Sequence, residues 1–147
     1  MNLVGAEEQK LSALSQLGIL VARAFELLEY TGRLYPSDAT VQFNPGIAYG
    51  MKGANEDSVA AYRRAIELEP EFMPAYLNLG LLFFSIDRIS AAAMVFRTGL
   101  DVDPISAPMY YGLALAEQKL GHAADARRAM ALAEKIDPEF IKEQQAK

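Results

Sequence analysis

The sequence predicts an all-α protein built as a solenoid of stacked helix-turn-helix pairs, and three observations support this fold class. Prolines recur at Pro36, Pro70, Pro104 and Pro138, with a constant step of 34 residues. Between them, apolar residues follow helical spacing, and each block has a break near its middle. A fixed period of this size is typical of repeat architectures, in which one unit cannot bury its apolar face alone. The 147 residues therefore fit a single domain of several units.

The first block, 5–38, keeps the shared pattern least. Only four of its residues stand in register with the later blocks: Leu11, Ala24, Leu28 and Pro36. Its N-terminal end is acidic where a signal peptide needs basic charge, and Lys10, Arg23 and Glu26 interrupt any apolar run of membrane length. The chain also has no Cys, which suits a reducing compartment. We therefore expect a degenerate helix pair here, in a cytoplasmic protein with no membrane segment.

The blocks 39–72, 73–106 and 107–140 each predict two helices joined by a turn. Within the turns, Gly53 and Gly121 suit the left-handed conformation that often closes a helix. Each second helix ends at the recurring proline, which cannot continue a helix. Three clear helix pairs are therefore expected.

Small and large residues keep the same register in these three blocks. The small residues lie in the first helices, at Gly46, Gly80 and Ala114. The large residues lie in the second helices, at Tyr62, Phe96 and Met130. We expect the small residues to let paired helices approach closely while the large ones fill the space between successive units.

Pro45 breaks one local rule inside a predicted helix. A proline removes one helical hydrogen bond and disfavours the helical conformation for Asn44. Either the helix starts late, with Asn44 as its N-cap, or it kinks. We expect either form to be structurally neutral, and the alternative is that Pro45 re-aims Phe43 into a binding face.

The tail, 141–147, is too short for a stable isolated helix. The last full helix is expected over 123–136, and it would then cap the array itself through Arg127, Arg128 and its many alanines. Otherwise this end of the array docks on another surface.

The pattern resembles the tetratricopeptide repeat, whose unit of about 34 residues reads W-x2-L-G-x2-Y, then A-x3-F, then P. The block 73–106 matches best, at Tyr76, Leu79, Gly80, Phe83, Ala92, Phe96, Gly99 and Pro104. The block 107–140 departs at Glu117, where an aromatic residue is usual, and 39–72 departs at Gln42, Pro45 and Ser58. The resemblance implies a right-handed superhelix of such pairs, an α-solenoid, over nearly the whole chain, 1–147.

Residues that could support catalysis are missing from the sequence. It has one His, no Cys and no phosphate-binding or zinc-protease motif. His122 falls in a turn, where we expect an ordinary solvated side chain. The carboxylates of 67–71 and 101–103 alternate around helix ends, so they do not converge as an acid/base pair or a metal site would. We therefore expect no enzyme activity, no cofactor and no metal.

Binding is the function that remains, and the resemblance implies where it would occur. The net charge of −5 has no basic patch that could neutralise phosphates, so nucleic acid is an improbable partner. In solenoids of this kind, the first helix of each pair lines a concave surface that binds a protein or peptide. By resemblance, the concave residues would be Phe43, Asn44, Ile47, Met51, Leu77, Asn78, Leu81, Phe84, Tyr111, Leu115, Gln118 and Lys119.

This predicted surface is mostly apolar, with Asn44 and Asn78 as polar points. Tetratricopeptide modules that hold the C-terminal carboxylate of a chaperone use Lys, Arg and Asn there, but Pro108 and Gly112 stand where basic residues would be needed. We predict a non-catalytic scaffold or adaptor that binds an extended or helical segment with apolar anchors.

Two alternatives stay open. In one, the groove is covered by the chain's own N-terminal segment or by a second copy in a homodimer. In the other, the protein is a secretion-type chaperone that dimerises and holds a client protein.

Overall fold

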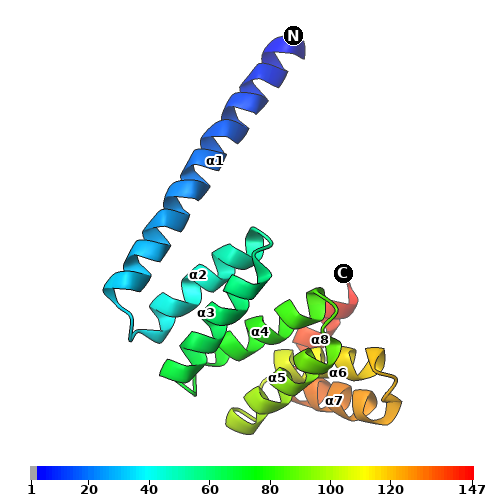
Figure 1. Ribbon diagram of the computed structural model, residues 1–147. Helices are drawn as coiled ribbons and strands as arrows, with labels where there is room; N and C mark the ends of the chain where they lie inside the picture. The colour runs from blue at the N-terminus through cyan, green and yellow to red at the C-terminus, as the bar shows by residue number, and fades with distance from the viewer. Residues whose placement is uncertain (1–2) are drawn as a thin grey trace.

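The structure is a computed structural model that describes residues 3–147, and eight helices make up this part of the chain. Figure 1 shows a long helix, α1 (Leu3–Leu34), projecting from a body of shorter helices. The body consists of α2 (Ala39–Met51), α3 (Asn55–Leu68), α4 (Met73–Ser85), α5 (Ile89–Val102), α6 (Ala107–Lys119), α7 (Ala123–Ile136) and α8 (Pro138–Gln145). The prediction of an all-α solenoid is confirmed.

The body is a stack of three helix pairs. Helix α2 packs against α3, α4 against α5, and α6 against α7 (Figure 1). The first helix of one pair also contacts the first helix of the next, because α4 touches both α2 and α6. Contacts between neighbours alone are what define a solenoid.

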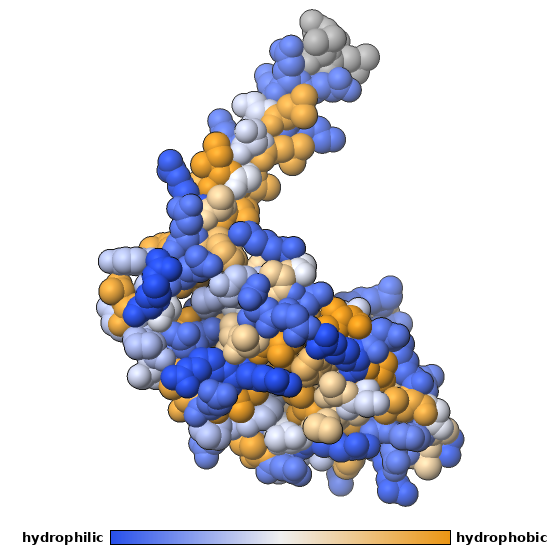
Figure 2. Space-filling view, viewed as in Figure 1, coloured by the Kyte–Doolittle hydropathy of each residue, from blue (hydrophilic) through white to orange (hydrophobic). Residues whose placement is uncertain are grey.

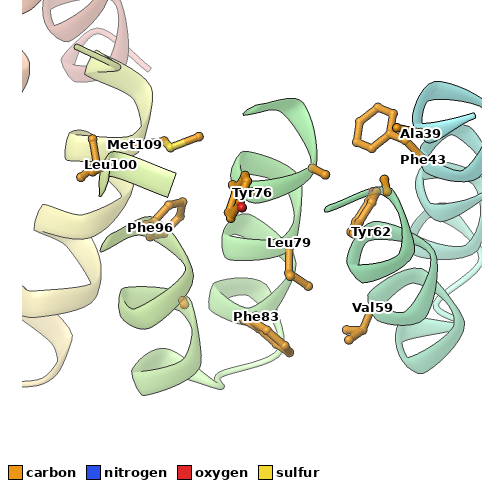
Figure 3. Packing of buried hydrophobic residues seen from close by; sticks show 13 residues of the cluster. Ala39, Phe43, Val59, Tyr62, Tyr76, Leu79, Phe83, Phe96, Leu100 and Met109 are labelled. Carbon is orange, nitrogen blue, oxygen red and sulfur yellow. The ribbon is translucent and has the colours of Figure 1, made fainter. Parts of the chain in front are cut away.

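Close packing follows the register of small and large residues. A Cβ atom added to Gly46 would lie 2.6 Å from the ring of Tyr62, and one added to Gly80 would lie 2.5 Å from the ring of Phe96. Figure 3 shows the large buried side chains following one another along the stack. The small residues therefore allow the close approach that the sequence predicts.

The three turns inside the pairs share one geometry. Gly53, Asp87 and Gly121 have positive φ angles of 75°, 61° and 82°, and they are one repeat apart. In each turn, the next residue donates its backbone N–H to a carbonyl five residues earlier, at 2.8–2.9 Å: Ala54 to Tyr49, Arg88 to Phe83 and His122 to Glu117. These bonds satisfy carbonyl groups that the helix end would otherwise leave open.

The prediction of a helix pair over 5–38 is wrong, because α1 is one continuous helix. One repeat before the left-handed turn residues stands Ile19, and a β-branched side chain strongly disfavours a positive φ. The positions that hold buried aromatic residues in α4 correspond here to Glu8 and Ser15. A folded-back helix would therefore bury polar groups as well as strain the turn.

Helix α2 passes through Pro45 without a break. Its N-cap is Asp38, whose carboxylate accepts a hydrogen bond from the backbone N–H of Val41 at 2.9 Å. The alternative of a late start with Asn44 as N-cap is therefore wrong.

The C-terminal end is a helix, although residues 141–147 were expected to be too short to form a stable helix alone. Asp137 caps α8 by accepting a hydrogen bond from the N–H of Phe140 at 2.9 Å, and Ile141 is 3% exposed. Helix α8 packs on α6 and α7. This packing supplies the stability that eight residues lack alone, and it covers the end that α7 was expected to cap by itself.

Most of α1 stands clear of the body, and α2 is its contact within the described residues. Figure 2 shows hydrophobic residues along this projecting helix, where Leu11 is 67% exposed and Leu17 is 56% exposed. By length and composition alone, the stretch Gly5–Leu34 would be enough to cross a membrane. The expectation that the chain has no membrane segment thus stays a prediction.

Candidate binding surfaces

Eight of the twelve predicted binding residues line two apolar hollows. Asn44, Ile47 and Met51 lie in a hollow between α1 and α2, which we name the α1–α2 hollow. The other five lie in a second hollow, the α4–α6 groove: Leu77, Leu81, Phe84, Tyr111 and Leu115. Helical periodicity explains both groupings, since side chains three and four residues apart share one face of a helix.

The α4–α6 groove has a volume of about 330 Å³. Leu77, Leu81 and Phe84 form one wall, and Pro108 joins Tyr111 and Leu115 on the other wall. Beneath the groove the buried ring of Phe96 packs directly against Gly112, which has no side chain to separate them. None of the residues that line the groove is charged, and Leu81 is 49% exposed.

Helix α8 contributes two residues that sequence reasoning missed. Phe140 and Gln144 line the α4–α6 groove, and the Phe140 ring meets Tyr111 edge-on at 5.8 Å between centroids. The pair Asp137-Pro138 could have revealed this helix, because an Asp N-cap followed by Pro is a helix-start signal. The C-terminal helix α8 therefore covers part of the α4–α6 groove, whereas α1 touches neither α4 nor α6.

Phe43 does not belong to either hollow. Its side chain is 9% exposed and its ring packs against Tyr62 and Phe72, at centroid distances of 5.3 and 5.2 Å. The prediction that Phe43 faces a ligand is therefore wrong, and so is the idea that Pro45 re-aims it toward one.

The three remaining predicted residues lie on α4 and α6, the two helices that wall the groove. Asn78 is half-buried on α4, and Gln118 is exposed on α6. Lys119 lies at the rim, with its Nζ 4.8 Å from the centroid of the Phe84 ring and 3.6 Å from Asp87. Lys119 is therefore a cation placed beside the groove.

Glu117, which stands where the repeat usually has an aromatic residue, is buried and bonded to two side chains. The carboxylate is 1% exposed, accepts a hydrogen bond from Arg97 and lies 2.7 Å from Nδ1 of His122. The His122 side chain is exposed, as expected, and its contact with Glu117 also helps to close the turn between α6 and α7. The cluster holds no third acidic or imidazole ligand, and residues 3–147 contain no group of His, Cys, Asp and Glu suited to a metal ion.

Polar contacts attach α1 to α2. The Tyr49 O–H donates to Glu29 at 2.9 Å, and this hydrogen bond, followed by burial and nearby carboxylates, raises the pKa of Tyr49. Gln42 donates to the Gly32 carbonyl at 2.9 Å. Lys52 lies 3.3 Å above the Phe25 ring centroid. These contacts hold the C-terminal half of α1 against α2.

Comparison with known proteins agrees with this geometry. The family description "TPR repeat" matches residues 48–87, and "Tetratricopeptide repeat" matches residues 107–140. The chain belongs to the tetratricopeptide repeat family. Its fold is thus that of a helical protein-binding module.

Individual relatives are similar over part of their length. The small glutamine-rich tetratricopeptide repeat-containing protein 2 of Mycosarcoma maydis is 26% identical over 91 residues, which cover 62% of this chain and 26% of that protein. The crystal structure of MamA superposes with a TM-score of 0.76 at 24% identity, covering 84% of this chain and 72% of MamA. The first TPR of Spaghetti (RPAP3) bound to the HSP90 peptide SRMEEVD superposes with a TM-score of 0.66 at 15% identity. The match covers 69% of this chain and 81% of the Spaghetti chain. The chain spans about a quarter of the length of the Mycosarcoma relative.

Proposed function

We propose that this protein is a non-catalytic scaffold or adaptor, and that its α4–α6 groove binds an extended or helical segment with apolar anchors. The observation that supports this ligand class is the groove itself, which is walled by Leu77, Leu81, Phe84, Tyr111 and Leu115 and lined without charge. Large apolar side chains that leave water for such a surface stabilise the complex. Asn78, half-buried on α4, offers an amide to the backbone of the bound segment.

The same composition disfavours an acidic C-terminal peptide. The peptide in the Spaghetti complex, SRMEEVD, ends in carboxylates, and such groups need basic partners when they leave water. Lys119, with its Nζ 4.8 Å from the centroid of the Phe84 ring, is already 3.6 Å from Asp87. We expect apolar anchors to be preferred over acidic ones.

A peptide selection tests this ligand class. A display library should enrich sequences with two or three apolar residues at a spacing of three or four. Binding of a selected peptide should weaken about 30-fold in a Leu81→Ala/Phe84→Ala variant, which corresponds to about 2 kcal/mol of lost binding free energy. Fluorescence anisotropy measures this affinity.

Two controls define the result. Met94→Ala removes a side chain that is 66% exposed on α5, away from the groove, and should leave the affinity unchanged. SRMEEVD serves as the acidic comparison peptide and should bind at least tenfold more weakly than the selected peptide. Selection of acidic C-termini instead, or equal binding by the groove variant, would contradict the proposal.

The exposed apolar side of α1 favours a second candidate function, a secretion-type chaperone that dimerises and holds a client. Such a protein would keep a non-native client soluble, whereas a scaffold binds a folded partner through a short segment. A light-scattering assay of client aggregation distinguishes the two functions.

A further inference from the structure

The α1–α2 hollow lies where the stack would place another helix. In the body, α2 packs between the second helix of its own pair, α3, and the first helix of the next pair, α4. The C-terminal half of α1 and the helix α2 correspond to α3 and α4 in this arrangement, yet no helix within residues 3–147 packs between them. The hollow has a volume of about 530 Å³ and a mostly apolar lining.

The repeat register supports this view of the hollow. Ala24 and Leu28 of α1 line it, and they stand one repeat before Ser58 and Tyr62. Ser58 and Tyr62 both face α2, because Cβ atoms added to the glycines of that helix would lie 3.4 Å and 2.6 Å from them. The hollow is thus an unfilled seat for a helix.

The N-terminal half of α1 has an apolar strip of the right kind to fill such a seat. Leu14 and Leu17 are each 56% exposed, and Val21 is 49% exposed. Steps of three and four residues join them to Ala24 and Leu28 in one line, so the strip continues the lining of the hollow along the same face. One chain cannot use both parts, because α1 is straight.

We propose that two copies of this chain pair through their α1 helices, so that the N-terminal half of each α1 fills the α1–α2 hollow of the other. An antiparallel pair with its two-fold axis near Ile19 brings Leu14 of one copy against Ala24 of the second and Leu17 against Val21. The interface is isologous, since the same strip serves both copies. This inference does not depend on what binds the α4–α6 groove.

Charge complementarity favours the antiparallel arrangement. With the axis near Ile19, Lys10 lies within one helical turn of Glu29 of the second copy, and Glu7 lies within one turn of its Arg33. A parallel pair would set each of these residues against its own like charge. The end charges therefore select one orientation of the two helices.

A membrane fits α1 less well than a second copy does. Helix α1 is long enough to cross a bilayer, but its run without charge, from Leu11 to Ala22, has 12 residues and spans about 18 Å of the roughly 30 Å core, so a crossing helix would place charged side chains in the hydrocarbon. Helix α1 has four acidic residues against three basic ones, so it lacks the basic excess that attracts anionic lipid. Its apolar strip therefore suits a protein surface.

Light scattering after size exclusion tests the pairing on the full chain. The wild type should show twice the chain mass of 16.1 kDa at micromolar concentration. Leu14→Glu/Leu17→Glu should show the chain mass, with the helical content and melting of the body kept, because these side chains lie outside it. Met94→Glu, on the exposed side of α5, should remain a dimer. A monomeric wild type, or a dimer in the double variant, overturns the proposal.

Introduced cysteines test the register, since the chain has none of its own. Positions 14 and 24 lie about 15 Å apart on one helix, too far for an internal disulfide. Leu14→Cys/Ala24→Cys should form a covalent dimer on oxidation, while Leu14→Cys alone should not. Equal cross-linking by the single variant overturns the antiparallel arrangement. Flotation of the wild type with anionic liposomes, combined with a monomeric state in solution, overturns the pairing in favour of a membrane.

Discussion

The buried Phe96 ring packs against two glycines, Gly80 and Gly112, which have no side chains. Its side chain is fully buried, and Cβ atoms added to Gly80 of α4 or to Gly112 of α6 would each lie 2.5 Å from its ring. The ring therefore fits between two successive pairs only because both facing positions are glycine. This single contact joins the packing inside a pair to the packing between pairs.

Adding a methyl group at Gly112 should overpack this site. We expect Gly112→Ala to lower the free energy of unfolding by about 1–3 kcal/mol, because the Phe96 ring must shift against a filled core. Gly80→Leu should cost at least as much. Urea denaturation measures the change, and Gly5→Ala is the control because nothing lies within 4 Å of its Cβ position. Wild-type stability of Gly112→Ala would contradict the packing described for Phe96.

The buried carboxylate of Glu117 makes a second prediction at this scale. Glu117→Gln keeps the shape but removes the charge that Arg97 and His122 contact, and we expect a loss of about 1.5–3 kcal/mol in the free energy of unfolding. Glu67→Gln is the matched control, since its ion pair with Arg64 is exposed on both sides and should contribute at most about 1 kcal/mol. Equal effects of the two changes in thermal denaturation would show that burial of Glu117 does not matter.

At the scale of elements, the turns decide where helix pairs form. Three turns use a left-handed residue, and at two of them it is glycine. Asp87 occupies the third, and a non-glycine residue there costs backbone energy. The turn position in α1 is Ile19, and the chain continues as a helix instead.

Replacing Asp87 with glycine should therefore stabilise the protein. We expect Asp87→Gly to raise the free energy of unfolding by about 1 kcal/mol, because glycine adopts the left-handed conformation without strain. The lost ion pair with Lys119 is exposed on both sides and should matter little. Asp87→Asn separates the two effects, since it removes the charge and keeps a residue that tolerates this conformation. A lower melting temperature for Asp87→Gly would contradict the strain argument.

The attachment of α1 to α2 should weaken in alkali. The raised pKa of Tyr49 means that the folded state favours the protonated phenol, whose O–H donates to Glu29. Its contribution to stability is therefore present below the ordinary value of 10.0 and is lost as the pH rises through the higher folded pKa. The stability difference between wild type and Tyr49→Phe should shrink as the pH rises above 10.0. Tyr30→Phe, at an exposed position, should show no such trend.

The sequence was informative where the repeat register was regular. Leu77, Leu81 and Tyr111 meet in the α4–α6 groove because their helices keep the repeat spacing. Phe43 stands in register with Leu77 but turns into the core, because Phe72 is there to meet its ring, whereas one repeat later that position is Ser106. Spacing alone does not reveal such a partner, since it comes from tertiary packing.

The two ends of the chain were harder to predict for the same reason. Register suggested a fourth helix pair, but Ile19 disallows its turn and α1 stays straight. The short length of 141–147 suggested no stable isolated helix there, but burial of Ile141 against the stack stabilises α8. At both ends the outcome depends on contacts outside the local sequence.

Over the whole molecule, stability is distributed along one dimension. Each pair touches only its neighbours, so the middle of the stack, α4 to α6, is supported from both sides while the ends are supported from one. The continuous core cluster runs from Ala39 to Met109, and the C-terminal end is closed by a separate contact through Ile141. The ends should therefore open before the middle does.

Hydrogen exchange on Ile141→Ala tests this gradient. The change should cost about 2–5 kcal/mol locally, because Ile141 is buried where α8 meets the stack. We expect faster exchange in α8 and α7, while amides of α3 to α5 keep their wild-type protection because their contacts with neighbours are unaltered. Phe96→Ala, in the middle of the stack, is the comparison, and it should speed exchange from α4 through α6. If Ile141→Ala instead sped exchange evenly from α2 to α8, the body would unfold as one cooperative unit, and its repeats would not behave as a chain of neighbours.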